Sequence, residues 1–414
     1  MSREIFVYAH WEQFDAPMVV GNLRVDQVRG GEHYSFAYDK QWLASPYVQQ
    51  IDPDLQLYQG EQHCLNNQNF RIFLDSCPDR WGRLLMQRRE AALAKQEDRR
   101  PKRLQESDYL LGVHDMYRMG ALRFKMSPEG DFLDNNKRLA APPVSSLREL
   151  EHAAAQVEQN SEMGDPDYLR WLYMLMAPGS SLGGARPKAC VIDEHDCLWI
   201  AKFPSRNDNY DLAAWEMLAH QIALKAGLVM APCRIERFNS PHHTFLTKRF
   251  DRMGGRRLHF SSAMTQLGYY DGEEGASYLE IAQFLMSHGG RAKKDLAQLW
   301  RRIVFSMAIS NTDDHLRNHG FIFTPRGWCL SPAYDLNPVP EALGLHLNVD
   351  DIDNRLDFEL AISVIDYFQL TESEAQVILS EVVEAVKAWP DVAEELGISR
   401  QEQMYMEPAF NVEN

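Results

Sequence analysis

Long apolar runs are absent from this sequence. Its 414 residues contain no apolar stretch of about eighteen residues, which is close to the length that a membrane-spanning helix needs. The first residues, MSREIFVYAHW, turn polar and charged too early for a secretory signal peptide. We therefore expect a cytoplasmic protein that does not contact a membrane.

Cysteine is scarce, and its six copies are scattered along the chain. None of them forms a C-x-x-C pair, the spacing typical of many structural zinc sites. The scattered positions also argue against a disulfide framework and agree with a reducing cytoplasm. The cysteines are Cys64, Cys77, Cys190, Cys197, Cys233 and Cys329.

Positive charge is in deficit. The chain has 43 Lys and Arg against 59 Asp and Glu, a formal net charge of −16. Such a chain is repelled by phosphate backbones, which disfavours direct binding of DNA or RNA over a broad face. The charge does not exclude binding of a nucleotide through a few local cations, or contact with DNA through a basic partner.

The apolar patterns predict an α+β fold with three parts. Short β-like runs punctuated by glycine open the chain and a helix follows, which predicts a β-rich N-terminal subdomain over residues 1–140. Residues 141–250 contain pairs of strand-like runs around one amphipathic helix that ends at Gly227, typical of a small antiparallel β-lobe. Helical patterns prevail in residues 251–414, which we expect to form a helical lobe.

The stretch ISNTDDHLRNHG carries a dense group of polar side chains directly after an apolar helix. Within it Asp313 and Asn318 stand as D-x-x-x-x-N, the spacing at which protein kinases place a catalytic base and a metal-binding amide. Asp335 follows the apolar run GFIFTPRGWCL, expected to be a strand, and stands where a Mg²⁺ carboxylate is expected. The motif around it reads YDL instead of DFG, so the chain is not an ordinary kinase.

Three features upstream add to this pattern. Lys202 lies in the apolar strand LWIAKF, where its ammonium must meet an anion, such as a nucleotide phosphate, or reach water. Glu216 on the next helix could pair with it, although an exposed helical glutamate is the commoner case. The stretch PGSSLGGARPK, with Gly183 and Gly184, could bring backbone amides close to phosphates. It is not a Walker A motif, and a plain turn is the alternative.

The order of these signals carries more weight than any one of them. A Gly-rich loop, a strand lysine, a helix glutamate, D-x-x-x-x-N and a downstream aspartate follow one another as they do in protein kinases, across a β-lobe and then a helical lobe. The pattern therefore predicts a kinase-like two-lobed fold.

Several longer stretches resemble the HipA family, the serine/threonine-kinase toxins of bacterial toxin–antitoxin modules. The resemblance covers nearly the whole chain: FLDSCPDRWGRLLMQRR resembles the family's N-terminal subdomain, and IAKFPS, TKRFDR and SPAYDLNPV resemble its kinase core. The stretches NTDDHLRNH and SLGGARPK are the most specific.

The resemblance implies ATP and Mg²⁺ as cofactors and gives roles to matching positions. Asp313 matches the catalytic base, Asn318 and Asp335 match the Mg²⁺ ligands, and Lys202 matches the lysine that contacts the nucleotide phosphates.

Further positions match the family's nucleotide site. The backbone from Lys248 to Phe250 matches the hinge that receives the adenine. Ser181 matches the serine that family members autophosphorylate, and the adjacent Ser180 could share or replace that role.

Partners are implied as well. HipA-like toxins are held inactive by a small HipB-like DNA-binding antitoxin, so this chain is expected to meet DNA only indirectly. Family targets include aminoacyl-tRNA synthetases, whose phosphorylation inhibits growth. Two alternatives stay open: a catalytically weak or non-toxic kinase-like corepressor, and a small-molecule kinase of the aminoglycoside or choline type.

Overall fold

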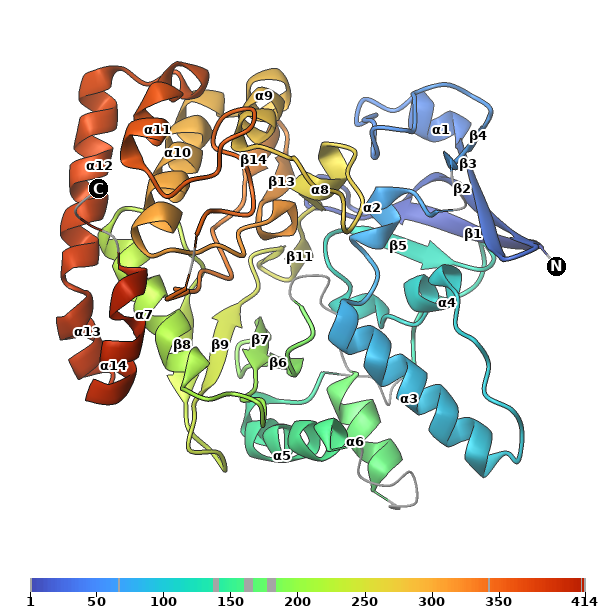
Figure 1. The fold of residues 1–414 in the computed structure, drawn as a ribbon. Helices are drawn as coiled ribbons and strands as arrows, with labels where there is room; N and C mark the ends of the chain where they lie inside the picture. Colours follow the sequence, from blue (N-terminus) through green and yellow to red (C-terminus); the bar gives the residue numbers. More distant parts are fainter. Residues whose placement is uncertain are drawn as a thin grey trace. The chain divides into compact units, whose positions relative to one another are not determined.

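The chain forms two compact units of mixed α and β structure (Figure 1). The computed structural model describes residues 2–65, 68–136, 141–159, 167–176, 184–341, 343–410 and 412. The N-terminal unit comprises Met1–Arg206 and Asp251–Ser261, and the C-terminal unit comprises Asn207–Phe250 and Ser262–Asn414. The α+β class is confirmed, whereas the predicted division into three domains at residues 140 and 250 stays a prediction.

A five-stranded antiparallel sheet in the order β4-β3-β2-β1-β5 begins the N-terminal unit. Its strands alternate buried and exposed residues, and the buried face includes Ile5, Val7, Leu23, Val25 and Phe36. This period of two is what packs one face of a sheet into a core. The strands are β1 (Ser2–Ala9), β2 (Met18–Val28), β3 (Gly31–Tyr38), β4 (Glu61–His63) and β5 (Leu122–Lys125).

Helices and two β-hairpins complete this unit. The hairpins are β6 (Lys188–Ile192) with β7 (Leu198–Lys202), and β10 (Arg252–Met253) with β11 (Arg256–Arg257). The helices are α1 (Lys40–Leu43), α2 (Arg71–Leu74), α3 (Arg80–Gln96), α4 (Glu106–Leu111), α5 (Leu147–Glu158) and α6 (Tyr168–Leu175). Helix α6 packs against both α3 and α5.

The C-terminal unit is mostly helical, as the sequence predicts. It contains α7 (Leu212–Lys225), α8 (Ala263–Gln266), α9 (Tyr278–His288), α10 (Ala292–Ala308), α11 (Phe358–Ser363), α12 (Glu372–Lys387), α13 (Trp389–Glu395) and α14 (Arg400–Met406). Its strands form the antiparallel pairs β8 (Cys233–Glu236) with β9 (Thr244–Lys248), and β13 (Gly320–Thr324) with β14 (Gly327–Leu330). Strand β12 (Phe260–Ser262) has residues in both units.

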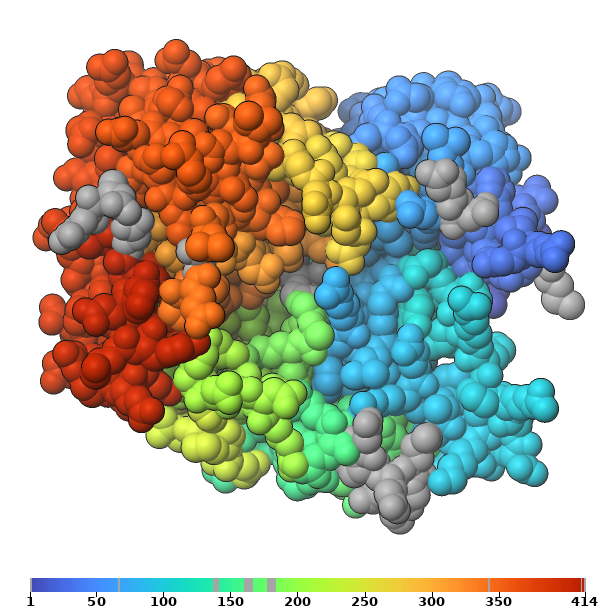
Figure 2. All heavy atoms as spheres, in the orientation of Figure 1, coloured from blue at the N-terminus to red at the C-terminus, as the bar shows by residue number. Residues whose placement is uncertain are grey.

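Helix α10 is the central element of this unit. Its apolar residues recur at helical spacing and are fully buried, among them Leu296, Leu299, Trp300 and Ile303. It packs against α9, α11 and α12, and Figure 1 shows it beside the last two. Figure 2 shows the C-terminal part of the unit, coloured orange to red, at the molecular surface. Because α10 is buried among these helices, it gives rigid support to the residues that follow its C-terminal end.

Helix α7 ends where the sequence predicts. Gly227 follows its last turn with a φ of 78°, and Leu228 N donates to Ala223 O at 2.9 Å. This left-handed glycine closes the helix, because a side chain there would be strained.

The run GFIFTPRGWCL, expected as one strand, is instead the hairpin β13–β14. Thr324 pairs with Gly327 across a tight turn that contains Pro325, and Gly327 has a φ of 119°. Proline and a positive-φ glycine interrupt an otherwise continuous apolar run, and this turn chemistry overrides the apolar pattern.

No helix in the described part of the chain is both long and apolar enough to cross a membrane.

Candidate functional site

The end of α10 sets the direction of the polar stretch. Ser310 takes a left-handed conformation, with a φ of 50°, and Asn311 N donates to Ser306 O at 2.8 Å. These two features stop the helix and turn the chain outward. Asp313 follows at the exposed tip of this turn, while its neighbour Asp314 is buried.

Asp313 and Asn318 are brought together, as the D-x-x-x-x-N spacing predicts. Asn318 lies in a short 3₁₀ helix, Leu316–Asn318, and is buried. Its Nδ2 donates to the backbone O of Asp313 at 2.9 Å, and the N of His315 donates to the same oxygen at 3.0 Å. The amide nitrogen thus fixes the loop, and Oδ1 is the side-chain atom of Asn318 suited to a cation.

The hairpin β13–β14 delivers Asp335 to the same end of the unit. Gly320 follows His319, the last residue of the polar stretch that contains Asp313, and Ser331 N donates to Gly320 O at 2.8 Å. The chain before β13 and the chain after β14 therefore leave the hairpin side by side. Asp335 is half-buried and has a φ of 61°, a strained conformation that aspartate tolerates better than most residues.

Three hydrogen bonds join the segment around Asp335 to the loop of Asp313. Asn337 N donates to Asn311 Oδ1 at 3.0 Å, and Val339 N donates to Ser310 O at 3.2 Å. Tyr334 Oη donates to Arg317 O at 2.6 Å. The two loops are therefore one connected structure, and the predicted base and metal ligands share it.

Asn311 is a buried connector that the sequence interpretation missed. Its Nδ2 donates to Ser306 Oγ at 3.3 Å while its Oδ1 accepts from Asn337 N, so it links α10 to the Asp335 segment. Its position at the end of an apolar helix, before the acidic pair, is a signal that could have identified it.

We expect Asn311→Ala to lower both stability and nucleotide affinity. The change leaves Asn337 N, which is only partly buried, without its acceptor, and an unsatisfied donor of this kind costs at most about 1–3 kcal/mol. The Asp335 segment then loses one of its three hydrogen bonds to the loop of Asp313. The KM for ATP–Mg²⁺ is therefore expected to rise more than kcat falls. Thermal unfolding and steady-state kinetics check this, and an unchanged KM would argue against the connector role.

Asp314 stabilises the loop of Asp313 through buried contacts with Tyr278 and His319. Tyr278 Oη donates to its Oδ2 at 2.6 Å, and His319 Nε2 lies 3.1 Å from its Oδ1. Burial raises the pKa of Asp314, but the nearby His319 and these contacts outweigh burial and hold the pKa below its ordinary value. The carboxylate is therefore charged at neutral pH and supports the loop through these two contacts.

Arg302 is a second support that the sequence interpretation missed. It is buried on α10, and its Nη2 donates to Ser331 O, the residue after β14. Burial lowers its pKa to about 10, although the negative charge of Asp314 opposes that shift. An arginine within the apolar pattern of RRIVFSMAI is the signal that could have revealed it.

The segment predicted to receive adenine adjoins Asp335. Lys248 ends β9, and its N donates to Pro232 O at 2.8 Å, while Ala333 N donates to Val229 O at 2.8 Å. The ring of Phe250 stacks on that of Tyr334, with centroids 5.6 Å apart. The predicted hinge and the predicted metal aspartate are thus neighbours within the C-terminal unit.

Lys202 and Glu216 are both buried, in different units. Lys202 is the last residue of β7 in the N-terminal unit, and Glu216 lies on α7 in the C-terminal unit. Burial excludes the simple alternative of an exposed helical glutamate, and their pairing stays a prediction.

The Gly-rich stretch is described only from Gly184 onward. Ser180, Ser181 and Gly183 lie outside the described residues. Gly184 is exposed, and its carbonyl oxygen accepts a hydrogen bond from Lys188 Nζ at 2.9 Å.

The donor atoms of the site suit magnesium. Mg²⁺ binds oxygen and commonly takes one or two carboxylates, with phosphates and water completing its shell. Asp335 and the Oδ1 of Asn318 fit that requirement. Across the described ranges no group of three or more His, Cys, Asp or Glu side chains is placed to hold a metal by itself.

Comparison with known proteins identifies the family to which part of the chain corresponds. Residues 180–389, about half of the chain, match the HipA-like C-terminal domain. A Haemophilus influenzae protein provisionally described as a kinase is 30% identical over 188 residues. That match covers 39% of this chain and 54% of the relative, so the chain spans about half the length of the relative.

The fold has a counterpart among solved structures. HipA, in the Shewanella oneidensis toxin–antitoxin complex with HipB and operator DNA, is similar over 98% of this chain and 94% of its own, with a TM-score of 0.64. At 17% sequence identity this likeness shows the fold.

Proposed function

The chain belongs to the HipA family, and we propose that it is an ATP- and Mg²⁺-dependent serine/threonine protein kinase that acts as a toxin. The observation that carries the proposal is the connected loop pair. Asn318 Nδ2 holds the backbone of Asp313 at 2.9 Å, and Asn311 holds the segment of Asp335 at 3.0 Å. Phosphoryl transfer needs placement and charge neutralisation more than covalent chemistry, and these loops supply placement.

In the proposed mechanism each side chain has one task. Asp313, exposed at its turn, orients a substrate hydroxyl and accepts its proton. Asn318 Oδ1 and the Asp335 carboxylate bind the metal ion, and Lys202 binds phosphate oxygens. The ATP–Mg²⁺ complex supplies the phosphoryl group and the neutralising charge. The backbone from Lys248 to Phe250 receives the adenine beside Tyr334.

We propose a protein substrate and a basic partner. A family member from Shewanella oneidensis is found with HipB and operator DNA, which supports a HipB-like antitoxin here. The net charge of −16 fits contact with DNA through such a partner. An aminoacyl-tRNA synthetase is the proposed class of target.

Labelling a bacterial lysate tests the proposed activity. Wild-type protein with γ-labelled ATP and Mg²⁺ is expected to label one or a few proteins on serine or threonine, and Asp313→Ala is expected to label none. Labelling confined to small molecules would favour the small-molecule kinase instead. Binding of an antitoxin without ATP turnover would favour the corepressor.

Autophosphorylation is expected to switch the enzyme off. A phosphate on Ser180 or Ser181 adds about −1.5 to −2 charges to the stretch that we propose contacts the ATP phosphates, and like charges repel. Intact mass spectrometry after incubation with ATP is expected to show added phosphate, with ATP affinity falling as the phosphate accumulates. Ser180→Ala and Ser181→Ala identify the site, and unchanged affinity of the phosphorylated form would contradict this regulation.

A further inference from the structure

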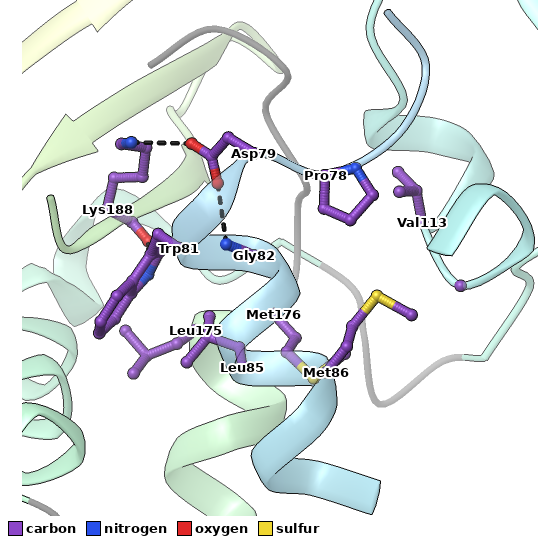
Figure 3. A pocket seen from close by; sticks show the side chains of 11 residues that line it. Pro78, Asp79, Trp81, Gly82, Leu85, Met86, Val113, Leu175, Met176 and Lys188 are labelled. Carbon is purple, nitrogen blue, oxygen red and sulfur yellow. Dashed lines mark hydrogen bonds and ion pairs between the residues drawn. The ribbon is translucent and has the colours of Figure 1, made fainter. Parts of the chain in front are cut away.

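A buried ion pair joins Asp79, the N-cap residue of α3, to strand β6 in the N-terminal unit (Figure 3). Lys188 Nζ lies 2.7 Å from Asp79 Oδ2, and the two side chains are 4% and 3% exposed. Trp81 Nε1 also donates to the backbone O of Lys188 at 3.0 Å. Burying two charges is unfavourable unless their geometry is well satisfied, so the further contacts of this pair are informative.

Each partner of the ion pair also makes a second hydrogen bond, Lys188 to Gly184 and Asp79 to Gly82. Lys188 Nζ donates to Gly184 O at 2.9 Å, which fixes the last glycine of the Gly-rich stretch. Asp79 Oδ1 accepts from Gly82 N at 2.8 Å and so caps α3. One ion pair thus sets Gly184 relative to the beginning of a long helix.

Lys188 also has a direct relation to Lys202. The two residues are opposite each other in the antiparallel register of β6 and β7. Opposite residues of such a pair point to the same face of the sheet, and like charges there repel. The carboxylate of Asp79 lies 2.7 Å from Lys188 Nζ and balances its charge, which reduces the repulsion expected between the two lysines.

Little water can reach the pair. Leu85 and Met86 of α3, Leu175 at the end of α6 and the following Met176 line the narrow cavity beside it (Figure 3). That cavity has a volume of about 10 Å³, room for at most one water molecule. The charge of Lys188 is therefore compensated by Asp79 rather than by solvent.

We propose that Asp79 and Lys188 are a positioning pair for nucleotide binding, a role that rests on the proposed kinase function. They act through Gly184 and Lys202, which they hold in place for the phosphates of ATP. Helix α3, far from these residues in the sequence, is then part of the nucleotide site's support. Removal of the pair weakens ATP binding even when the fold remains stable.

Binding of a fluorescent ATP analogue with Mg²⁺, together with thermal unfolding, tests this role on the full chain. The variants are Asp79→Asn, Lys188→Met and both together. Asn caps a helix as well as Asp does, so α3 keeps its cap. Each single variant is expected to lower Tm and raise the Kd for ATP at least about tenfold. In the double variant no charge is left unpaired, so Tm is expected to recover while the Kd stays raised.

A matched control separates this effect from general damage to α3. Arg83 on the same helix forms an ion pair with Glu106, the first residue of α4, with Nη1 and Oε1 2.5 Å apart. This ion pair joins α3 to α4 and does not involve a residue of β6. Glu106→Gln is expected to leave the Kd unchanged. Recovery of both Tm and Kd in the double variant, or an equal rise of Kd in Glu106→Gln, would overturn the positioning role. Absence of ATP binding by the wild type would instead contradict the proposed function, and this role with it.

Discussion

Asp313→Asn is expected to slow phosphoryl transfer by about 10²–10⁴-fold, the usual contribution of a general base, without a change in Tm. Asp313 is exposed, and the loop uses its backbone carbonyl, which the substitution keeps. Kinase assays and thermal unfolding of the same preparation check both halves of this expectation.

The neighbouring residue is the matched control. Asp314→Asn removes a buried charge that Tyr278 and His319 contact at 2.6 and 3.1 Å, and breaking a buried pair of this kind costs about 3–5 kcal/mol. We therefore expect a clear fall in Tm. Equal loss of stability in Asp313→Asn and Asp314→Asn would contradict the separate roles.

The difference in stability between the wild type and Asp314→Asn is expected to depend on pH. Its pKa is lowered in the folded protein, so its contribution to stability is complete above the ordinary aspartate pKa of about 3.9 and is lost as the pH falls below that value. The wild type is expected to lose stability more steeply than Asp314→Asn as the pH falls below about 4.

The second large effect is expected at the metal ligands. Asp335→Asn removes the carboxylate while keeping a residue that tolerates a φ of 61°, so the fold should persist and Mg²⁺-dependent transfer should be lost. Titration of activity with Mg²⁺ measures this. Unchanged Mg²⁺ dependence would exclude Asp335 as a ligand.

Asn318 allows its two tasks to be separated. Asn318→Ala removes both the metal-binding oxygen and the Nδ2 that holds Asp313 O, so Mg²⁺ affinity and kcat should fall together. Asn318→Asp keeps oxygen ligands but loses that donor, so kcat should fall while Mg²⁺ affinity is retained. Identical behaviour of the two variants would contradict the division of roles.

Local features of the site could be predicted from the sequence, because they depend on residues only a few positions apart. The D-x-x-x-x-N spacing places Asn318 against Asp313, and an apolar helix before it provides support. The run GFIFTPRGWCL is predicted as one strand because it is apolar along most of its length. It contains a turn instead, and Pro325 and Gly327 are the residues that favour that turn.

Long-range supports could not be predicted in the same way. Asn311 meets Asn337, Arg302 meets Ser331, and Lys188 meets Asp79, each pair being brought together by the tertiary fold rather than by a repeating pattern. A single sequence shows that such a polar residue stands among apolar ones, but it does not identify the partner.

The most direct test of the central claim is Mg²⁺-dependent transfer of labelled phosphate from ATP by the purified chain, with Asp313→Asn beside it. We expect the wild type to transfer phosphate to serine or threonine only when Mg²⁺ is present, and Asp313→Asn, folded and equally stable, not to transfer it. Transfer at the same rate by both proteins, or by neither, would contradict it.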